Sequence, residues 1–103
     1  MKKNQFTEIT KWQKKTFGQA TLLSKIAHLK EEVEELEEAV YKNENVSSTL
    51  MEFADCFILL FGAASSYGMD YEHICEAIEA KMKINRVRKW GVQKENGVVN
   101  HIK

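Results

Sequence analysis

A regular apolar seam in the middle of the chain restricts its fold more than any other feature. Six aliphatic residues recur at intervals of 4, 3, 4, 3 and 4: Leu22, Ile26, Leu29, Val33, Leu36 and Val40. That spacing places all six on one face of an α-helix. Proline is absent from the whole sequence, so no proline interrupts helices elsewhere. We therefore predict an all-α protein.

Glycines and capping residues divide the rest of the chain into further helices. The first is expected over about Gln5–Phe17, with Gly18 at its end. The polar stretch "YKNENVSS" then connects the seam helix to a third helix, which we expect to start with Ser47, Ser48 or Thr49 as its N-cap and to run to about Tyr67 before Gly68. A fourth helix is expected from about Tyr71 to Lys89 with Asp70 as N-cap, followed by an irregular tail at about 91–103.

Length and charge narrow the class of protein. A chain of 103 residues with 44% hydrophobic content fits a single domain, 1–103, whose modest core favours self-association. Fifteen basic and fifteen acidic residues leave no broad positive field, so we expect no nucleic-acid partner. The longest apolar run, Cys56–Ala64, is far shorter than the roughly 20 residues that span a bilayer. We expect a soluble, cytoplasmic protein with Cys56 and Cys75 reduced.

Two acidic residues stand in an otherwise apolar segment. Glu52 and Asp55 are the only charges between Leu50 and Met69. A buried carboxylate without a partner costs several kcal/mol, so such a group normally pairs, becomes protonated or binds a cation. A capping box between Thr49 and Glu52 is an alternative reason for Glu52, but it leaves Asp55 unexplained.

A second acidic pair lies on the seam helix. On a helical wheel, Glu32 and Glu35 share one flank of the seam with His28, and their three-residue spacing lets both carboxylates approach the same point. If the seam helix and the next helix form an antiparallel hairpin, the two pairs face each other as a four-carboxylate cluster. Oxygen ligands of this kind suit Mg²⁺, with Mn²⁺ as a possible substitute, and favour phosphate-bearing substrates. The alternative is a solvated acidic helix face.

The fourth helix carries a row of polar side chains. Lys81, Asn85 and Arg88 fall at i, i+4 and i+7 and offer an ammonium, an amide and a guanidinium suited to phosphate oxygens. The alternative is a basic helix end that is favoured by the helix dipole.

Together these motifs resemble a known superfamily. "EEVEE", sixteen residues and "EFAD" are similar to the EExxE, spacer, ExxD signature of the MazG-like all-α nucleoside triphosphate pyrophosphohydrolases, and "KMKINRVR" resembles the KxxxNxxR element of that superfamily. "WQKKTFG" and "NGVVNHIK" resemble the phage and bacterial branch of dATP/dGTP diphosphohydrolases. The resemblance covers about Trp12 to Lys103.

The resemblance implies a four-to-five-helix bundle of the all-α NTP pyrophosphatase type, assembled into a homodimer or homotetramer with active sites between subunits. It implies Mg-dependent cleavage of a purine (deoxy)nucleoside triphosphate between its α- and β-phosphates. The residues implied as catalytic metal ligands are Glu32, Glu35, Glu52 and Asp55. Glu31 completes the motif in a supporting role, and Lys81, Asn85 and Arg88 are implied to hold phosphates.

Recognition of the base is less defined by the sequence. Trp12 and Gln13 are candidates for stacking on and hydrogen-bonding a purine, with Phe17 beside them, and His28 shares the flank of Glu32. Core packing of the aromatics is the alternative. Two other functions remain open: a non-catalytic helical interaction module, and a sensor that binds nucleotide without hydrolysing it.

Overall fold

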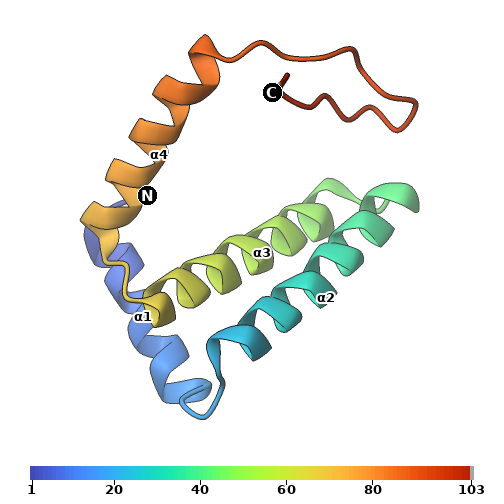
Figure 1. Cartoon of the computed structure of the whole chain (residues 1–103). Helices are drawn as coiled ribbons and strands as arrows, with labels where there is room; N and C mark the ends of the chain where they lie inside the picture. The colour runs from blue at the N-terminus through green and yellow to red at the C-terminus, as the bar shows by residue number, and fades with distance from the viewer. Residues whose placement is uncertain (103) are drawn as a thin grey trace. The chain divides into compact units, whose positions relative to one another are not determined.

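Four helices make up most of the chain. The computed structural model describes residues 1–102, in which α1 spans Lys3–Thr16, α2 Leu22–Tyr41, α3 Val46–Tyr67 and α4 Tyr71–Val87 (Figure 1). The only β-type pairing in this described part is one isolated bridge, so the all-α prediction is confirmed. The chain divides into two compact units, Met1–Tyr71 and a second that begins at Glu72.

The predicted start of α3 is wrong by several residues. The N-cap is Asn45, whose side-chain oxygen accepts a 2.8 Å hydrogen bond from the backbone N–H of Ser48. Ser47, Ser48 and Thr49 therefore lie inside the first turn, because asparagine caps as well as serine does and comes earlier in the chain. The Thr49 hydroxyl donates to the carbonyl of Asn45 at 3.1 Å. A capping box starting at Thr49 thus does not account for Glu52.

The other helix ends lie near their predicted positions. Gly68 ends α3 with φ 111°, and the backbone N–H of Met69 donates to the carbonyl of Ala64 at 3.0 Å, a glycine-dependent C-cap. Thr21 caps α2 by accepting from the Ser24 N–H at 3.1 Å. α4 ends at Val87, two residues before the predicted Lys89.

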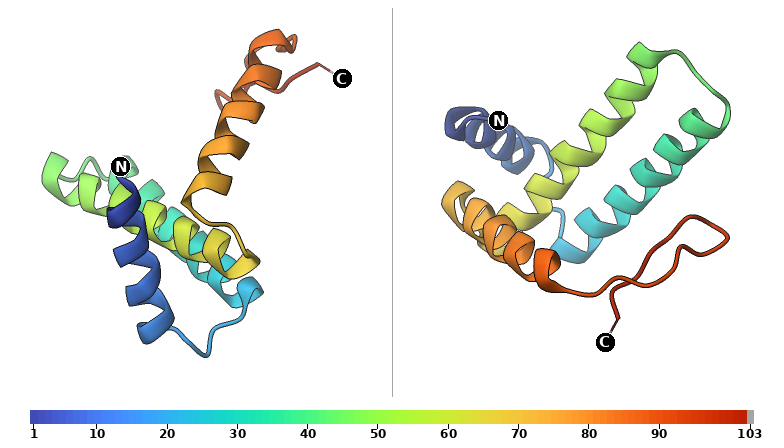
Figure 2. Two further views of the ribbon diagram at one scale, coloured as in Figure 1. Left: turned by 90° about the vertical axis from the view of Figure 1, so that its left-hand side faces the viewer. Right: turned by 90° about the horizontal axis from the view of Figure 1, so that it is seen from above.

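A helical hairpin is the main structural feature of the first unit. α2 and α3 run antiparallel and lie side by side along their lengths, and α1 packs against α3 (Figures 1 and 2). The buried apolar core of the described residues is small: Phe6, Ala39, Leu59 and Ala63. Phe6 contacts both Phe61 and Tyr71, with ring centroids 5.7 and 5.8 Å apart.

Gln13 joins α1 to α3. Its side chain is 1% exposed, and its amide Nε2 donates a hydrogen bond to the backbone carbonyl of Ile58. The approach is possible because Gly62 has no side chain: a Cβ on Gly62 would lie 1.7 Å from Gln13 Oε1. This buried amide fixes the position of α1 along α3.

One face of α3 remains uncovered. The residues that recur along it at intervals of 3, 4 and 3 are 43–57% exposed: Leu50, Phe53, Phe57 and Leu60. We call these four residues the α3 apolar face.

By length and composition alone α3 could cross a membrane, and it is the one such helix in the described part of the chain, with 17% of its most apolar window buried. The sequence-based expectation considered only the unbroken apolar run Cys56–Ala64. A longer window of α3, which includes residues outside that run, has a mean hydropathy of 1.5. Core helices of soluble proteins can have the same length and composition.

The second unit consists of the rest of α4 and a folded C-terminal segment. Residues 91–102 form no helix or extended strand, as predicted, and Lys103 lies outside the described residues. The segment is nevertheless ordered by pairing: Trp90 and His101 form an antiparallel bridge, and Gly91 N–H donates to the Asn100 carbonyl at 2.7 Å. We call residues 89–102 the C-terminal hairpin.

Candidate functional site

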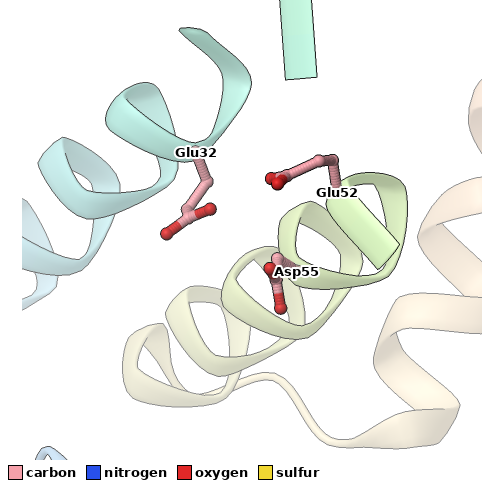
Figure 3. A group of neighbouring side chains, drawn as sticks. All are labelled: Glu32, Glu52 and Asp55. Carbon is pink, nitrogen blue, oxygen red and sulfur yellow. The ribbon is translucent and has the colours of Figure 1, made fainter. Parts of the chain in front are cut away.

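Three carboxylates converge between α2 and α3. Glu32 extends from α2 toward Glu52 and Asp55 on α3, and one oxygen of each lies within 4.8 Å of the others (Figure 3). The antiparallel hairpin creates this meeting point, because the three-residue spacing of Glu52 and Asp55 puts both on the side of α3 that faces α2. The structure therefore brings together three of the four carboxylates that the sequence singled out.

Glu35 lies beside the same cluster. Its side chain shares a hydrogen bond with Glu32, and its negative charge raises the pKa of both Glu32 and Glu52. Glu35 is exposed, so it borders the cluster from the solvent side. Glu31 is also exposed on α2 and is not one of the three converging residues.

Burial within the cluster differs from the expectation. Asp55 is exposed, whereas Glu32 and Glu52 are half-buried. Within the described part of the chain, Oε2 of Glu32 and Oε2 of Glu52 are the buried side-chain oxygens without a hydrogen-bond partner. Desolvation therefore acts on Glu32 and Glu52, and not on Asp55 as expected.

Electrostatics confirm that the glutamates lack compensation. Burial is the largest cause that raises the pKa of Glu32, followed by the hydrogen bond and charge of Glu35 and the charge of Asp55, while His28 lowers it. Burial also leads for Glu52, whose pKa is raised further by Glu35, Asp55 and Glu44. Except for His28, all the charges that act on these two groups among the described residues are acidic. Apart from His28, no positively charged group among those acting on the two glutamates offsets this negative charge.

This donor set fits a divalent cation. The cluster offers only carboxylate oxygens, two of which are buried and unpaired, and a hard cation such as Mg²⁺ or Mn²⁺ would satisfy both the oxygens and the charge. Four carboxylates exceed what a structural ion pair needs. The residues that would hold the ion are Glu32, Glu52 and Asp55, with Glu35 in reach through Glu32.

A small cavity adjoins the carboxylates. It has a volume of about 160 Å³ and is lined by Trp12, Phe17, His28, Glu32, Asp55, Ile58 and Leu59. Phe17 meets Trp12 and His28 edge to face, with ring centroids 5.5 and 5.9 Å apart. His28 Nε2 lies 3.6 Å from Glu32 Oε1. The cavity thus has aromatic rings at one end and acids at the other.

Two of the three predicted base-recognition residues line this cavity. Trp12 is 54% exposed and His28 is half-buried, so both are accessible. Gln13 is not among the lining residues, because its amide is buried against Ile58 and Gly62. Its place in the structure is in the core, and a role in reading a base does not fit it.

Sequence reasoning missed two cavity residues, Ile58 and Leu59. Both lie one turn beyond Asp55 at i+3 and i+4, so the helical spacing that paired the acids would have found them. Cys56 was read as structural, and burial together with the nearby carboxylates raises the pKa of its thiol. The raised pKa keeps this residue a neutral thiol at neutral pH.

The predicted phosphate-binding row belongs to the second unit. Lys81 and Asn85 lie on α4, with Lys81 exposed and Asn85 half-buried. Arg88 is half-buried and follows the last residue of α4, where its backbone N–H still donates to the Ile84 carbonyl at 3.1 Å. The row is thus present on one element, near the end of the helix.

The raised pKa values of Glu32 and Glu52 give a pH prediction for the metal-free protein. A carboxyl group with a higher pKa in the folded than in the unfolded state favours folding when it is protonated, and this stabilisation is lost as the pH rises through the folded-state pKa. In chelator, the melting temperature should therefore rise as the pH is lowered from about 8 toward about 5. Glu32→Gln should flatten this dependence, as differential scanning calorimetry would show. A melting temperature that falls steadily over the same range would contradict the assignment of repulsion to this cluster.

The chain is similar to known proteins both in sequence and in structure. A family model described as dATP/dGTP pyrophosphohydrolase matches residues 5–103. A curated dATP/dGTP diphosphohydrolase of Salmonella phage PMBT28 is 36% identical over 94 residues, which are 91% of this chain and 29% of that protein. A second, from Cyanophage S-2L, is 42% identical over 52 residues, which are 50% of this chain and 46% of that protein. The matched segments thus cover less than half of each curated relative.

A solved structure is also similar along nearly its whole length. It is the Cyanophage S-2L MazG-like pyrophosphohydrolase bound to dGDP and three catalytic Mn²⁺ ions per active site. The TM-score is 0.73 at 34% sequence identity, and the match covers 95% of this chain and 92% of that one.

Proposed function

This chain belongs to the dATP/dGTP pyrophosphohydrolase family, and from that premise we propose that it hydrolyses dATP and dGTP between the α- and β-phosphates. The products are the deoxynucleoside monophosphate and pyrophosphate. The resemblance to the MazG-like superfamily that the acidic motifs indicated is confirmed by the family match and the similar structure. The observation that supports the activity most strongly is the meeting of Glu32, Glu52 and Asp55 within 4.8 Å, with two of their buried oxygens unpaired.

The metal-binding residues of the proposal are Glu32, Glu35, Glu52 and Asp55. Mg²⁺ is the proposed ion and Mn²⁺ the substitute, because the ligands are all oxygens. Divalent cations held by these residues would neutralise phosphate charge and would lower the pKa of the attacking water molecule. Glu31 is given a supporting role, since it completes the motif from the exposed side of α2.

Two groups of residues are proposed to bind the substrate, one in each unit of the chain. The cavity beside Glu32 and Asp55 is proposed to take the nucleoside, with the rings of Trp12 and His28 against the base. Ile58 and Leu59 form an apolar wall that excludes water next to the acids. Lys81, Asn85 and Arg88 are proposed to bind the outgoing phosphates.

A second copy of the chain is the proposed cover of the α3 apolar face. Leu50, Phe53, Phe57 and Leu60 lie on the side of α3 away from Asp55, so a partner helix there leaves the carboxylates accessible. A bilayer is a poor alternative, because the same helix carries Glu52 and Asp55, and charges within a membrane are costly. We propose a homodimer or homotetramer in the cytoplasm, with no nucleic-acid or membrane partner.

A substitution on the α3 apolar face should convert the proposed oligomer to monomers. Phe57 is 57% exposed in the isolated chain, so Phe57→Glu should shift the protein from dimer or tetramer to monomer. Sedimentation velocity would measure the change, and Leu23→Glu is the matched control, since Leu23 is 78% exposed on α2 and outside this face. A monomeric wild type, or a Phe57→Glu variant that remains oligomeric, would contradict this interface.

Product analysis tests the activity itself. Purified protein should convert dATP and dGTP to monophosphate and pyrophosphate in equal amounts when Mg²⁺ or Mn²⁺ is present, and not in chelator. Release of inorganic phosphate and a diphosphate would overturn the cleavage position. Tight nucleotide binding without any product would favour the sensor instead.

A further inference from the structure

The C-terminal hairpin is attached to the part of α4 that carries the phosphate-binding row. The indole Nε1 of Trp90 donates a 3.1 Å hydrogen bond to the backbone carbonyl of Asn85. This carbonyl lies in the last turn of α4, where helix carbonyls have no intrahelical donor and must find another partner. A side chain of the hairpin therefore completes the end of the helix.

Pairing across the hairpin holds Trp90 in place. Trp90 and His101 form the antiparallel bridge, and their rings meet edge to face with centroids 6.0 Å apart. Backbone bonds flank this pair on both sides: Gly91 N–H to the Asn100 carbonyl at 2.7 Å, and Ile102 N–H to the Lys89 carbonyl at 2.6 Å. These contacts hold Trp90 in place independently of its hydrogen bond to Asn85. Figure 1 shows the chain running out from α4 and returning on itself in this segment.

Two backbone hydrogen bonds restrain the chain at Arg88 and at the residue after it. Its own N–H donates to the Ile84 carbonyl at 3.1 Å, and the next residue, Lys89, accepts from Ile102. Arg88 follows the last helical residue, Val87, so α4 alone does not set its backbone conformation. Its half-buried side chain contrasts with the exposed Arg86 and Lys89 on either side.

We propose that the C-terminal hairpin is a clamp on the end of α4 and that Trp90 is a positioning residue for Arg88. The proposal rests on the assignment of Arg88 to phosphate binding. By holding the Asn85 carbonyl, Trp90 keeps the final turn from fraying, and Arg88 is presented in one orientation to the triphosphate. Pre-ordering of this kind reduces the entropy lost on binding a charged ligand.

The main test is Trp90→Phe, which keeps an aromatic ring opposite His101 and removes the indole N–H together with one of the two fused rings. Loss of one neutral hydrogen bond predicts a KM for dGTP about fivefold higher, with kcat changed less than about twofold. Mn²⁺ affinity should stay unchanged, because none of the proposed metal ligands, Glu32, Glu35, Glu52 and Asp55, lies in the hairpin. Val92→Ala is the matched control, since Val92 belongs to the same hairpin and is 91% exposed.

A double-mutant cycle separates positioning from general stability. In an Arg88→Ala background, Trp90→Phe should change the KM by less than about twofold, because its effect is transmitted through Arg88. An undiminished effect in that background would overturn the proposal. A Trp90→Phe variant that melts at a lower temperature but has an unchanged KM for dGTP would also overturn the proposal.

Hydrogen exchange tests the clamp without relying on turnover. The Arg88 amide should exchange about fivefold faster in Trp90→Phe than in the wild type, while the control Val92→Ala matches the wild type. Equal exchange in all three proteins would refute the clamp even in an active enzyme. A wild type that releases no pyrophosphate would refute the proposed function and with it the role of Arg88, while the exchange measurement would still decide whether the clamp exists.

Discussion

Asp55→Asn is expected to abolish most activity without weakening the fold. Asparagine has nearly the same volume as aspartate, and Asp55 is exposed, so the substitution leaves packing intact. It removes one charge from a cluster in which Asp55 raises the pKa of both Glu32 and Glu52. In metal-free buffer the melting temperature should therefore stay constant or rise, since repulsion between like charges falls.

Catalysis should change in the opposite direction. Loss of a metal ligand removes charge stabilisation at the α-phosphate, and pyrophosphate release should fall by at least about a hundredfold. Glu37→Gln is the matched control, because it removes one exposed acid of α2 that lies outside the cluster and should leave activity within about twofold. A variant that is less stable but fully active would mean that Asp55 is a structural residue.

Gly62→Ala should have the largest effect on stability. A Cβ at this position would lie 1.7 Å from Oε1 and 2.3 Å from Cδ of Gln13. Gln13 is 1% exposed and cannot move without leaving the interface between α1 and α3, where it donates to the Ile58 carbonyl. Overpacking combined with an unpaired buried amide should lower the free energy of unfolding by about 2–4 kcal/mol.

A second substitution identifies the cause. If the clash with Gln13 is responsible, Gln13→Ala in the Gly62→Ala background should restore part of the lost stability, although Gln13→Ala alone destabilises the protein. Urea unfolding of the four proteins measures this coupling. Independent, additive losses would show that α1 docks on α3 by other contacts.

The helices were predictable because local rules determine them. The seam of α2 and the glycine that ends α3 gave elements within a few residues of those observed. The start of α3 was misplaced because Asn45, Ser47 and Ser48 are all competent caps, and only the hydrogen bond to Ser48 N–H distinguishes them. Neighbouring residues compete for such a position with nearly equal energies.

The site was predictable in part for the same reason. Helical spacing and an antiparallel hairpin suffice to bring Glu32 to Glu52 and Asp55, and the structure confirms that meeting. Helical spacing does not show how much of a carboxylate side chain is exposed to solvent. Asp55 was therefore expected to be buried, whereas it is exposed. The assignment of these residues as metal ligands remains a prediction.

Contacts between distant segments were not predictable. Gln13 was a candidate for hydrogen-bonding a purine, and nothing local reveals that it lies against Gly62, forty-nine positions later. The pairing of Trp90 with His101 likewise joins residues on opposite sides of a turn without any alternating pattern. Such pairs depend on where whole elements meet, which a short sequence window does not contain.

Direct measurement of Mn²⁺ binding tests the central claim, that the carboxylates between α2 and α3 form a divalent-metal site. Free Mn²⁺ can be titrated into the full chain and followed by its electron paramagnetic resonance signal, for the wild type, Glu32→Gln and the control Glu37→Gln. The wild type and Glu37→Gln should bind Mn²⁺ alike, and Glu32→Gln should bind at least about tenfold more weakly. Equal binding by all three proteins, or no binding by the wild type, would contradict the metal site.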